Sequence, residues 1–294
     1  MDHIPVYIGE GIEYKEKYDD ELRKDFIKNN SKFPFDIFGF PIGTYKDGEK
    51  IWFPDFFKGF YVIYGKEYCD TFKADGKADI YLIETLAKYS PENKLRIILI
   101  SPPHDIAKIP IEFYKNIDLW AMGGGFDDGI ISDNLIRQEY NWGISPENTK
   151  KMLEKLNKTN TKIKLISSSL IRNLDIIIHE SEYKEICNLI EKKNIKLYNA
   201  ILKDWEYSNK GNKLIIHKNL CDPTIVILSM NMIEFTSNIV LYEIINDTTY
   251  IDYLNTKNMK MKYDINGNCI FINDIKNTKL LIEKILESIN YYCV

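Results

Sequence analysis

Polar and charged side chains come directly after several apolar stretches of this sequence, in three clusters. Ser101–Asp105 follows one such stretch, Met122–Asp128 follows a second, and Cys221–Pro223 comes much later in the chain. Because ligands of open α/β sheets bind beyond the carboxyl ends of the strands, these clusters are the first candidates for a site.

Glu139, Tyr140 and Asn141 lie shortly downstream of the second cluster. If this stretch is extended, residues two apart share one side of the chain, so a carboxylate and an amide would point the same way. Such a pair can bind the hydroxyls of a polyol. The alternative interpretation is a hydrogen-bond network at the start of the helix that follows.

The apolar stretches that precede these clusters predict the strands that position them. They are Leu95–Ser101, Ile117–Met122 and Lys162–Ser169. Their alternation with helix-like segments is typical of parallel βα units. We therefore predict an α/β fold, with a mostly parallel open sheet and helices on both faces.

The clearest helix is predicted to start at Pro146, since Ser145 suits the N-cap and proline suits the first helical position. Further helices are predicted for Ala78–Lys88, Glu180–Lys193 and Thr278–Ile289. No repeat or linker divides the chain, so we expect a single domain over residues 1–294.

Composition excludes some classes of function. The 294 residues carry a formal net charge of -4, without the basic field that drives nonspecific nucleic-acid binding. We expect no nucleic-acid partner, no membrane partner and a cytoplasmic location, because no apolar run has the length of a membrane span. The five cysteines and four histidines are scattered, which argues against disulfides and zinc sites. A homo-oligomer is compatible with the sequence.

Residues 33–68 depart from both periodicities. They contain the aromatic strings FDIFGFP and IWFPDFFKGF, broken by glycine and proline. One interpretation is an aromatic loop or hairpin inserted into the fold; the other is a surface for base stacking or for a protein partner.

The order of the motifs resembles the nucleoside hydrolase family, the inosine-uridine preferring N-ribohydrolases. The strings MGGGF and QEYNWGISPENTKKML resemble the family's MGG, EFN and DPEAA motifs. IPVYIGE, PPHDIA, KIKLISSSLIRN and Cys221-Asp222-Pro223 stand in the order of IPVY-G, GPLTNIA, the next strand and loop, and His-Asp-Pro.

The resemblance implies hydrolysis of the N-glycosidic bond of a ribonucleoside, with ribonucleoside or ribose as the ligand and calcium as the cofactor. The substrate-binding positions it implies are Met122, Asp133, Glu139, Tyr140 and Asn141. It further implies Asp222 as a calcium ligand, together with the backbone carbonyl of His104. An oxocarbenium-like sugar would be stabilised by nearby carboxylates.

The departures from the family bear on activity. The family's DTDPGIDD string, which supplies metal-binding aspartates and the general base, is absent from the sequence, and Cys221 stands where the family has its leaving-group histidine. A thiol is a weak hydrogen-bond donor. The sequence therefore leaves the catalytic residue unassigned, and calcium has too few predicted oxygen ligands.

Three hypotheses remain at this point. The first is a nucleoside hydrolase-like protein whose catalysis is lost or weakened. The second is an active ribonucleoside hydrolase, with carboxylates relocated to Asp127 and Asp128 or supplied by a separate polypeptide. The third is a non-enzymatic scaffold that binds a partner through the aromatic segment 33–68.

Overall fold

The computed structural model describes the larger part of the chain. The described residues are 5, 7–8, 44–46, 49–51, 76–125, 132–137, 139–143, 145–179, 184, 188, 217–245 and 257–292. They belong to two compact units, formed by residues 1–76 with 183–216 and by residues 77–182 with 217–292. The second unit holds the central sheet. A single domain over residues 1–294 stays a prediction.

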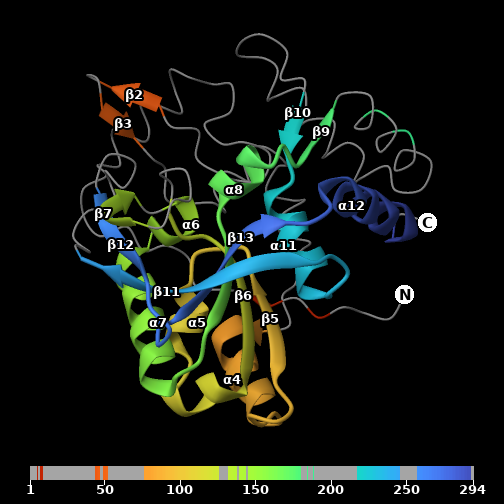
Figure 1. Ribbon diagram of the computed structural model, residues 1–294. Helices are drawn as coiled ribbons and strands as arrows, with labels where there is room; N and C mark the ends of the chain where they lie inside the picture. The colour runs from red at the N-terminus through yellow and green to blue at the C-terminus, as the bar shows by residue number, and fades with distance from the viewer. Residues whose placement is uncertain are drawn as a thin grey trace. The chain divides into compact units, whose positions relative to one another are not determined.

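The elements follow one another along the chain as α/β units (Figure 1). In chain order they are β1 (Tyr7–Ile8), β2 (Thr44–Lys46), β3 (Glu49–Ile51), β4 (Gly76–Lys77), α4 (Ala78–Leu86), β5 (Leu95–Leu99), α5 (His104–Lys108), the 3₁₀ helix η1 (Ile111–Asn116), β6 (Ile117–Met122), β7 (Ser132–Arg137), α6 (Tyr140–Gly143), α7 (Pro146–Thr159), β8 (Ile163–Ile166), α8 (Ser168–Asn173), β9 (Ile177–His179), β10 (His217–Asn219), α11 (Cys221–Ser229), β11 (Phe235–Ile244), β12 (Lys257–Tyr263), β13 (Cys269–Ile275) and α12 (Thr278–Tyr292).

The central sheet has seven strands in the order β5-β6-β8-β13-β11-β12-β7. The first four are parallel to one another, whereas β11, β12 and β7 extend the sheet through antiparallel pairs. The predicted α/β fold with a parallel core is thus confirmed. The carboxyl ends of the parallel strands meet at one edge, as predicted for the polar clusters.

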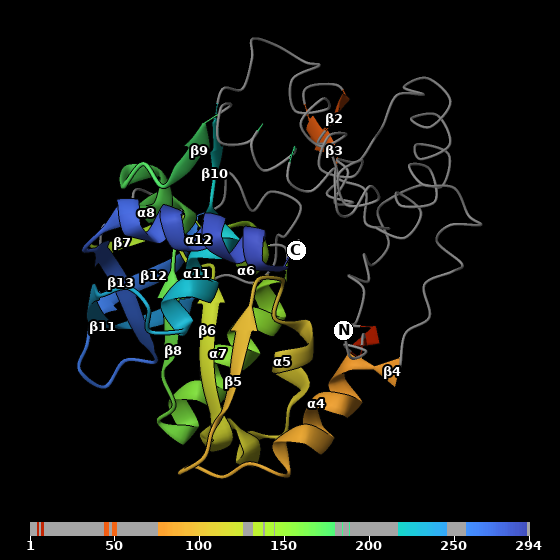
Figure 2. The same ribbon diagram turned by 90° about the vertical axis from the view of Figure 1, so that its right-hand side faces the viewer.

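Helices cover both faces of this sheet (Figure 2). Alternation along β6 decides which side chain meets which layer. Leu119 and Ala121 join the core cluster with Leu156 of α7, while α11 packs on β5 and β6 and in turn contacts α12.

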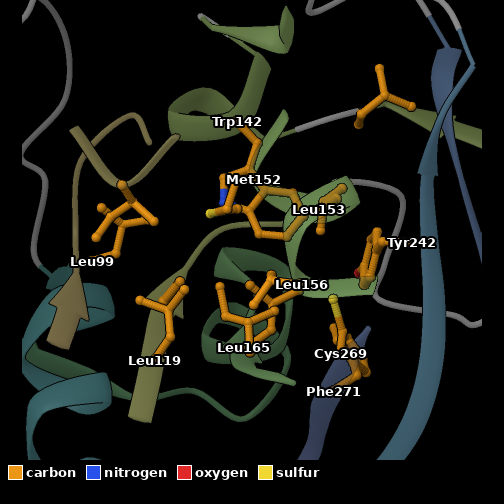
Figure 3. Close-up of a cluster of buried hydrophobic side chains, with 14 of the residues drawn as sticks. Leu99, Leu119, Trp142, Met152, Leu153, Leu156, Leu165, Tyr242, Cys269 and Phe271 are labelled. Carbon is orange, nitrogen blue, oxygen red and sulfur yellow. The ribbon is translucent and has the colours of Figure 1, made fainter. Parts of the chain in front are cut away.

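The core between the sheet and α7 is made of large apolar side chains. Ten of them are labelled in Figure 3: Leu99, Leu119, Trp142, Met152, Leu153, Leu156, Leu165, Tyr242, Cys269 and Phe271. Met152, Leu153 and Leu156 recur on one face of α7, as predicted. Burial of these groups is the main term that holds the layers together.

The predicted strand and helix positions agree with the structure apart from several boundaries; strand β5, for example, ends at Leu99 and not at Ser101. Ser168 and Ser169 were expected at the end of a strand, but they begin helix α8, because Ser167 accepts a hydrogen bond from the amide of Leu170 and caps that helix. Helix α4 ends at Leu86, earlier than predicted, and α12 continues to Tyr292. The helix predicted for Glu180–Lys193 lies outside the described residues except at positions 184 and 188.

Helix α7 begins as predicted, with Pro146 at its first turn and Ser145 before it. The Ser145 side chain makes no capping bond to a helix amide; it accepts a hydrogen bond from Nδ2 of Asn148 at 3.0 Å. The helix ends at Asn160, whose φ of 52° is the left-handed conformation common at helix ends.

Short two-stranded sheets lie outside the central sheet. Strands β2 and β3 pair antiparallel within the aromatic segment 33–68, and the rest of that segment lies outside the described residues. Strands β9 and β10 place His179 opposite His217, a proximity that the sequence spacing did not indicate. Within the described part of the chain, no helix has the length and apolar character to cross a membrane.

Candidate functional site

The candidate site begins at the glycine turn that follows β6. Gly124 has a φ of 102°, which a residue with a side chain rarely adopts. A Cβ atom there would lie 2.9 Å from Cδ2 of Leu165 and 3.0 Å from the hydroxyl of Tyr242. A Cβ on Gly123 would lie 2.3 Å from Nε1 of Trp142. The turn therefore fits between two aromatic side chains only because it has no side chains of its own.

Those two aromatic side chains are buried partners. The rings of Trp142 and Tyr242 meet edge to face with centroids 5.5 Å apart. Among the described residues, neither Nε1 of Trp142 nor the hydroxyl of Tyr242 has a hydrogen-bond partner, which is uncommon for buried polar atoms.

Glu139 is held against this turn by its own backbone and side chain. Its amide donates to the carbonyl of Gly124 at 2.7 Å. Its carboxylate accepts from the amides of Asn141 at 2.9 Å and Trp142 at 3.0 Å. These are amides at the start of α6, which have no partner within the helix, so Glu139 caps α6. Sequence reasoning expected an extended stretch here; Asn141 is helical instead.

Asn141 links α6 to the end of β6. Its Nδ2 donates to the main-chain carbonyl of Met122 at 3.3 Å. The side chains of Met122, Glu139 and Asn141 are all buried. The structure therefore brings three of the predicted substrate-binding residues together at one strand end, and it also contains the hydrogen-bond network that was the alternative interpretation.

Asp222, in the first turn of α11, is near enough to Glu139 for its charge to act on that carboxyl. Burial raises the pKa of Glu139 to about 8, against the lowering effect of the two amides that it accepts from, and the charge of Asp222 raises it further. Asp222 is exposed at the surface, yet partial desolvation raises its pKa as well. Two acidic groups thus share one neighbourhood, with Glu139 inside and Asp222 at the rim.

Cys221, at the predicted leaving-group position, is a poor acid in this setting. Burial and the neighbouring charge of Asp222 raise the pKa of the thiol to about 11. The positive charge of Arg172 acts in the opposite direction. A thiol with so high a pKa is not an activated nucleophile.

His104 begins helix α5 at the end of β5 and is buried. Among the described residues, no three His, Cys, Asp or Glu side chains gather into a group that could hold a metal ion. Calcium normally takes six to eight oxygen ligands. Asp222 and the carbonyl of His104 therefore do not by themselves fit calcium, and calcium binding stays a prediction that needs carboxylates from elsewhere.

Several predicted residues are described only in part. Asp133 lies in β7 and Tyr140 in α6, but their side chains are outside the described residues. Asp127 and Asp128, the proposed replacements for the lost carboxylates, lie outside them altogether. Their roles stay predictions.

Arg172 was not singled out from the sequence, although it lies in the KIKLISSSLIRN string that carries part of the resemblance. Helix α8, which carries it, starts directly after the end of β8. The rule that polar residues after strand ends line ligand sites could have found it.

No family model matches this chain, and no curated protein matches it. Among solved structures, the chain is similar to a purine-preferring ribonucleoside hydrolase from Gardnerella vaginalis, with a TM-score of 0.57, 17% identity and coverage of 99% of this chain and 81% of the other. The fold is nucleoside hydrolase-like.

A second similar structure is the type III effector protein XopQ, which was solved in complex with adenosine diphosphate ribose. Its TM-score is 0.51 at 11% identity, over 81% of this chain and 70% of the other. At these identities the two similarities establish the fold, whereas function depends on the residues at the site.

Proposed function

We propose that this chain is a nucleoside hydrolase-like protein that binds a ribonucleoside or ribose at the end of β6, and that its hydrolysis of the N-glycosidic bond is lost or weakened. The observation that carries the proposal is the attachment of Glu139 and Asn141 to the Met122–Gly124 turn. This attachment holds a carboxyl and an amide at a strand end of a fold shared with ribonucleoside hydrolases.

These groups suit a sugar. Each carboxyl oxygen of Glu139 accepts one backbone amide and has a further lone pair for a hydroxyl. Because the pKa of Glu139 is raised to about 8, the folded chain at neutral pH also offers the carboxyl proton as a donor. Asn141 uses one Nδ2 hydrogen on the carbonyl of Met122, which leaves a second donor and the Oδ1 acceptor. Ribose-containing ligands are therefore the ligands to test. Adenosine diphosphate ribose is one of them, because the XopQ complex contains it.

Weak catalysis is proposed because the described groups lack parts that the reaction needs. Departure of the base requires protonation or hydrogen bonding of the leaving group, and the position where the resemblance places a histidine holds Cys221, a weak donor. Activation of a water requires a base and usually a metal ion, and the described carboxylates do not form a metal-binding group.

The binding experiment uses isothermal titration calorimetry with inosine and with ribose. The wild-type chain is expected to bind, and Asn141→Ala and Glu139→Gln are expected to weaken binding by about tenfold or more. Glu147→Gln, a change at an exposed glutamate of α7, is the control. Absence of wild-type binding to both ligands would overturn the binding part of the proposal.

The activity experiment measures cleavage of inosine and uridine with and without added calcium. We expect turnover far below that of an ordinary N-ribohydrolase. Ordinary turnover that Asp222→Ala abolishes would overturn the proposed loss of catalysis. Together with a rise in Tm at millimolar calcium, that result would favour the active hydrolase with carboxylates relocated or supplied by a separate polypeptide.

A further inference from the structure

We propose that the ligand of this site is a phosphorylated riboside and that Arg172 binds its phosphate group. The inference rests on the proposed function, since it assigns a second part of the ligand to a residue beside the ribose-binding groups. Neither Glu139 nor Asn141 distinguishes a phosphorylated riboside from an unphosphorylated one.

Arg172 lies on an element that adjoins the strands and turn carrying the site residues. Strand β8 pairs with β6 so that Ile166 lies opposite Met122, and the amide of Gly123 donates to the carbonyl of Ile166 at 3.0 Å. Helix α8 starts at Ser168, directly after this junction. Arg172 is therefore one short helix away from the glycine turn that holds Glu139.

A backbone hydrogen bond links the segment after α8 to the start of α11. The amide of Leu220 donates to the carbonyl of Ile176, 3.1 Å away, so the segment after α8 lies beside the residue that precedes Cys221. The charges of Arg172 and Glu139 both act on the Cys221 thiol. The guanidinium, the thiol and the buried carboxyl thus share one region of the molecule.

The side chain of Arg172 suits a phosphate group. A guanidinium is always charged and presents a planar set of donors that matches two phosphate oxygens. Nη2 of Arg172 lies 3.5 Å from Oγ of Ser169, and Ser169 is 2% exposed. Ser169 is thus placed to orient one edge of the guanidinium, and Arg172 is an exposed residue.

Burial and charge differ between the Glu139 end and the Arg172 end of the site. Glu139 is 4% exposed and its two oxygens face backbone amides, which suits the uncharged hydroxyls of a sugar. Arg172 lies toward solvent, where a strongly hydrated phosphate loses less hydration on binding than it would inside. A ribose with a phosphate substituent matches both ends.

The experiment compares methyl β-ribofuranoside with its 5-phosphate by calorimetry. The methyl group fixes the furanose ring in both, so this pair differs only in the phosphate and involves no base. The wild-type chain is expected to bind the 5-phosphate about tenfold or more tightly than the unphosphorylated riboside. Arg172→Gln should remove this preference and leave the Kd for the unphosphorylated riboside unchanged. Arg172→Lys should retain part of it, since a lysine keeps the charge but not the planar donors.

Lys158→Gln, which removes an exposed charge from α7, is the matched control for net charge and should keep the full preference. Inorganic phosphate alone is expected to compete with methyl β-ribofuranoside 5-phosphate only weakly. Equal affinity for the two sugars, or a preference that survives in Arg172→Gln, would overturn this inference while the proposed function stands. Binding of neither sugar would overturn the proposed function and this inference together.

Discussion

Asn141 donates from Nδ2 to the main-chain carbonyl of Met122, 3.3 Å away, and so joins the first turn of α6 to the end of β6. Glu139 reinforces the junction through the amides of α6 and the carbonyl of Gly124. A short helix of four residues has little stability of its own. Its position is therefore decided by these contacts.

Glu139 is expected to make the stability of the chain depend on pH. Burial raises its pKa to about 8 from an ordinary value of 4.5. Between these two values the unfolded chain has released the proton and the folded chain still holds it, so the free energy of unfolding falls as pH rises. In urea unfolding at pH 5, 7 and 8.5, the free energy of unfolding of Glu139→Gln should fall less with rising pH than that of wild type. Glu147→Gln, at an exposed position, should leave the slope unchanged, and equal slopes in wild type and Glu139→Gln would contradict the prediction.

The glycine turn should tolerate a side chain less well at position 124 than at position 125. Gly124→Ala forces an alanine into a φ of 102° with its Cβ 2.9 Å from Leu165, at a cost of about 1–3 kcal/mol. In Gly125→Ala the nearest atom is Cδ1 of Ile136, 2.5 Å away, at the end of a side chain that can rotate. Thermal unfolding of both variants checks the order of their Tm values; a lower Tm for Gly125→Ala would count against it.

Asp118 is expected to fasten α11 to the sheet. Its carboxylate accepts from Nε of Arg96 at 2.9 Å and from Nζ of Lys164 at 2.6 Å, and Arg96 also donates to the carbonyl of Ser229 at the end of α11. Asp118→Asn removes the charge that both cations face and should lower the free energy of unfolding by about 1–3 kcal/mol.

The pH dependence of this variant provides a second check. Burial alone would raise the pKa of Asp118, but the hydrogen bonds from Lys164 and Arg96 outweigh burial and lower it. The advantage of wild type over Asp118→Asn should therefore be present at neutral pH and shrink as pH falls through the pKa of folded Asp118. In the control, Glu147→Gln removes an exposed ion pair with Lys151 and should change stability by about 0.5 kcal/mol or less.

Lys155 is expected to hold the segment that begins with His104. Its Nζ donates to the carbonyl of Ala107, within α5, at 2.7 Å and to that of Ile109, directly after α5, at 2.8 Å. Lys155→Met keeps the apolar stem and removes both bonds, and should cost about 1–3 kcal/mol. Hydrogen exchange at residues 104–109 should become faster than in Lys158→Met, an exposed change on the same helix; equal exchange in the two variants would contradict the role of Lys155.

The larger elements could be predicted because their signals are local. The apolar run Ile117–Met122 coincides with β6, and Ser145 with Pro146 marks the start of α7. Such signals depend on residues a few positions apart, which the chain brings together whatever the rest does. The two predicted strands that flank β6 in the sheet, β5 and β8, were likewise found, with small differences in their ends.

The antiparallel half of the sheet could not be predicted in this way. Strands β7 and β12 pair although more than a hundred residues separate them, and no local period encodes a pairing of that range. The conformation of Asn141 shows the same limit at the scale of one residue. An isolated Glu-x-Asn stretch is compatible with an extended chain. In the structure the amides of Asn141 and Trp142 donate to the side chain of Glu139, and the amide of Glu139 donates to Gly124 of the glycine turn, so the stretch is helical.

The sequence by itself determined the residue types, the strand-end positions of Met122, Glu139, Asn141 and Asp222, and the resemblance that names a class of ligand. Only the tertiary structure decided that Glu139 is buried with a raised pKa and that the charge of Arg172 reaches Cys221. The physical reason is that burial and electrostatic proximity are properties of packed neighbours, and these neighbours come from β6, α6, α8 and α11, which are separate in sequence and adjacent only once the sheet has formed.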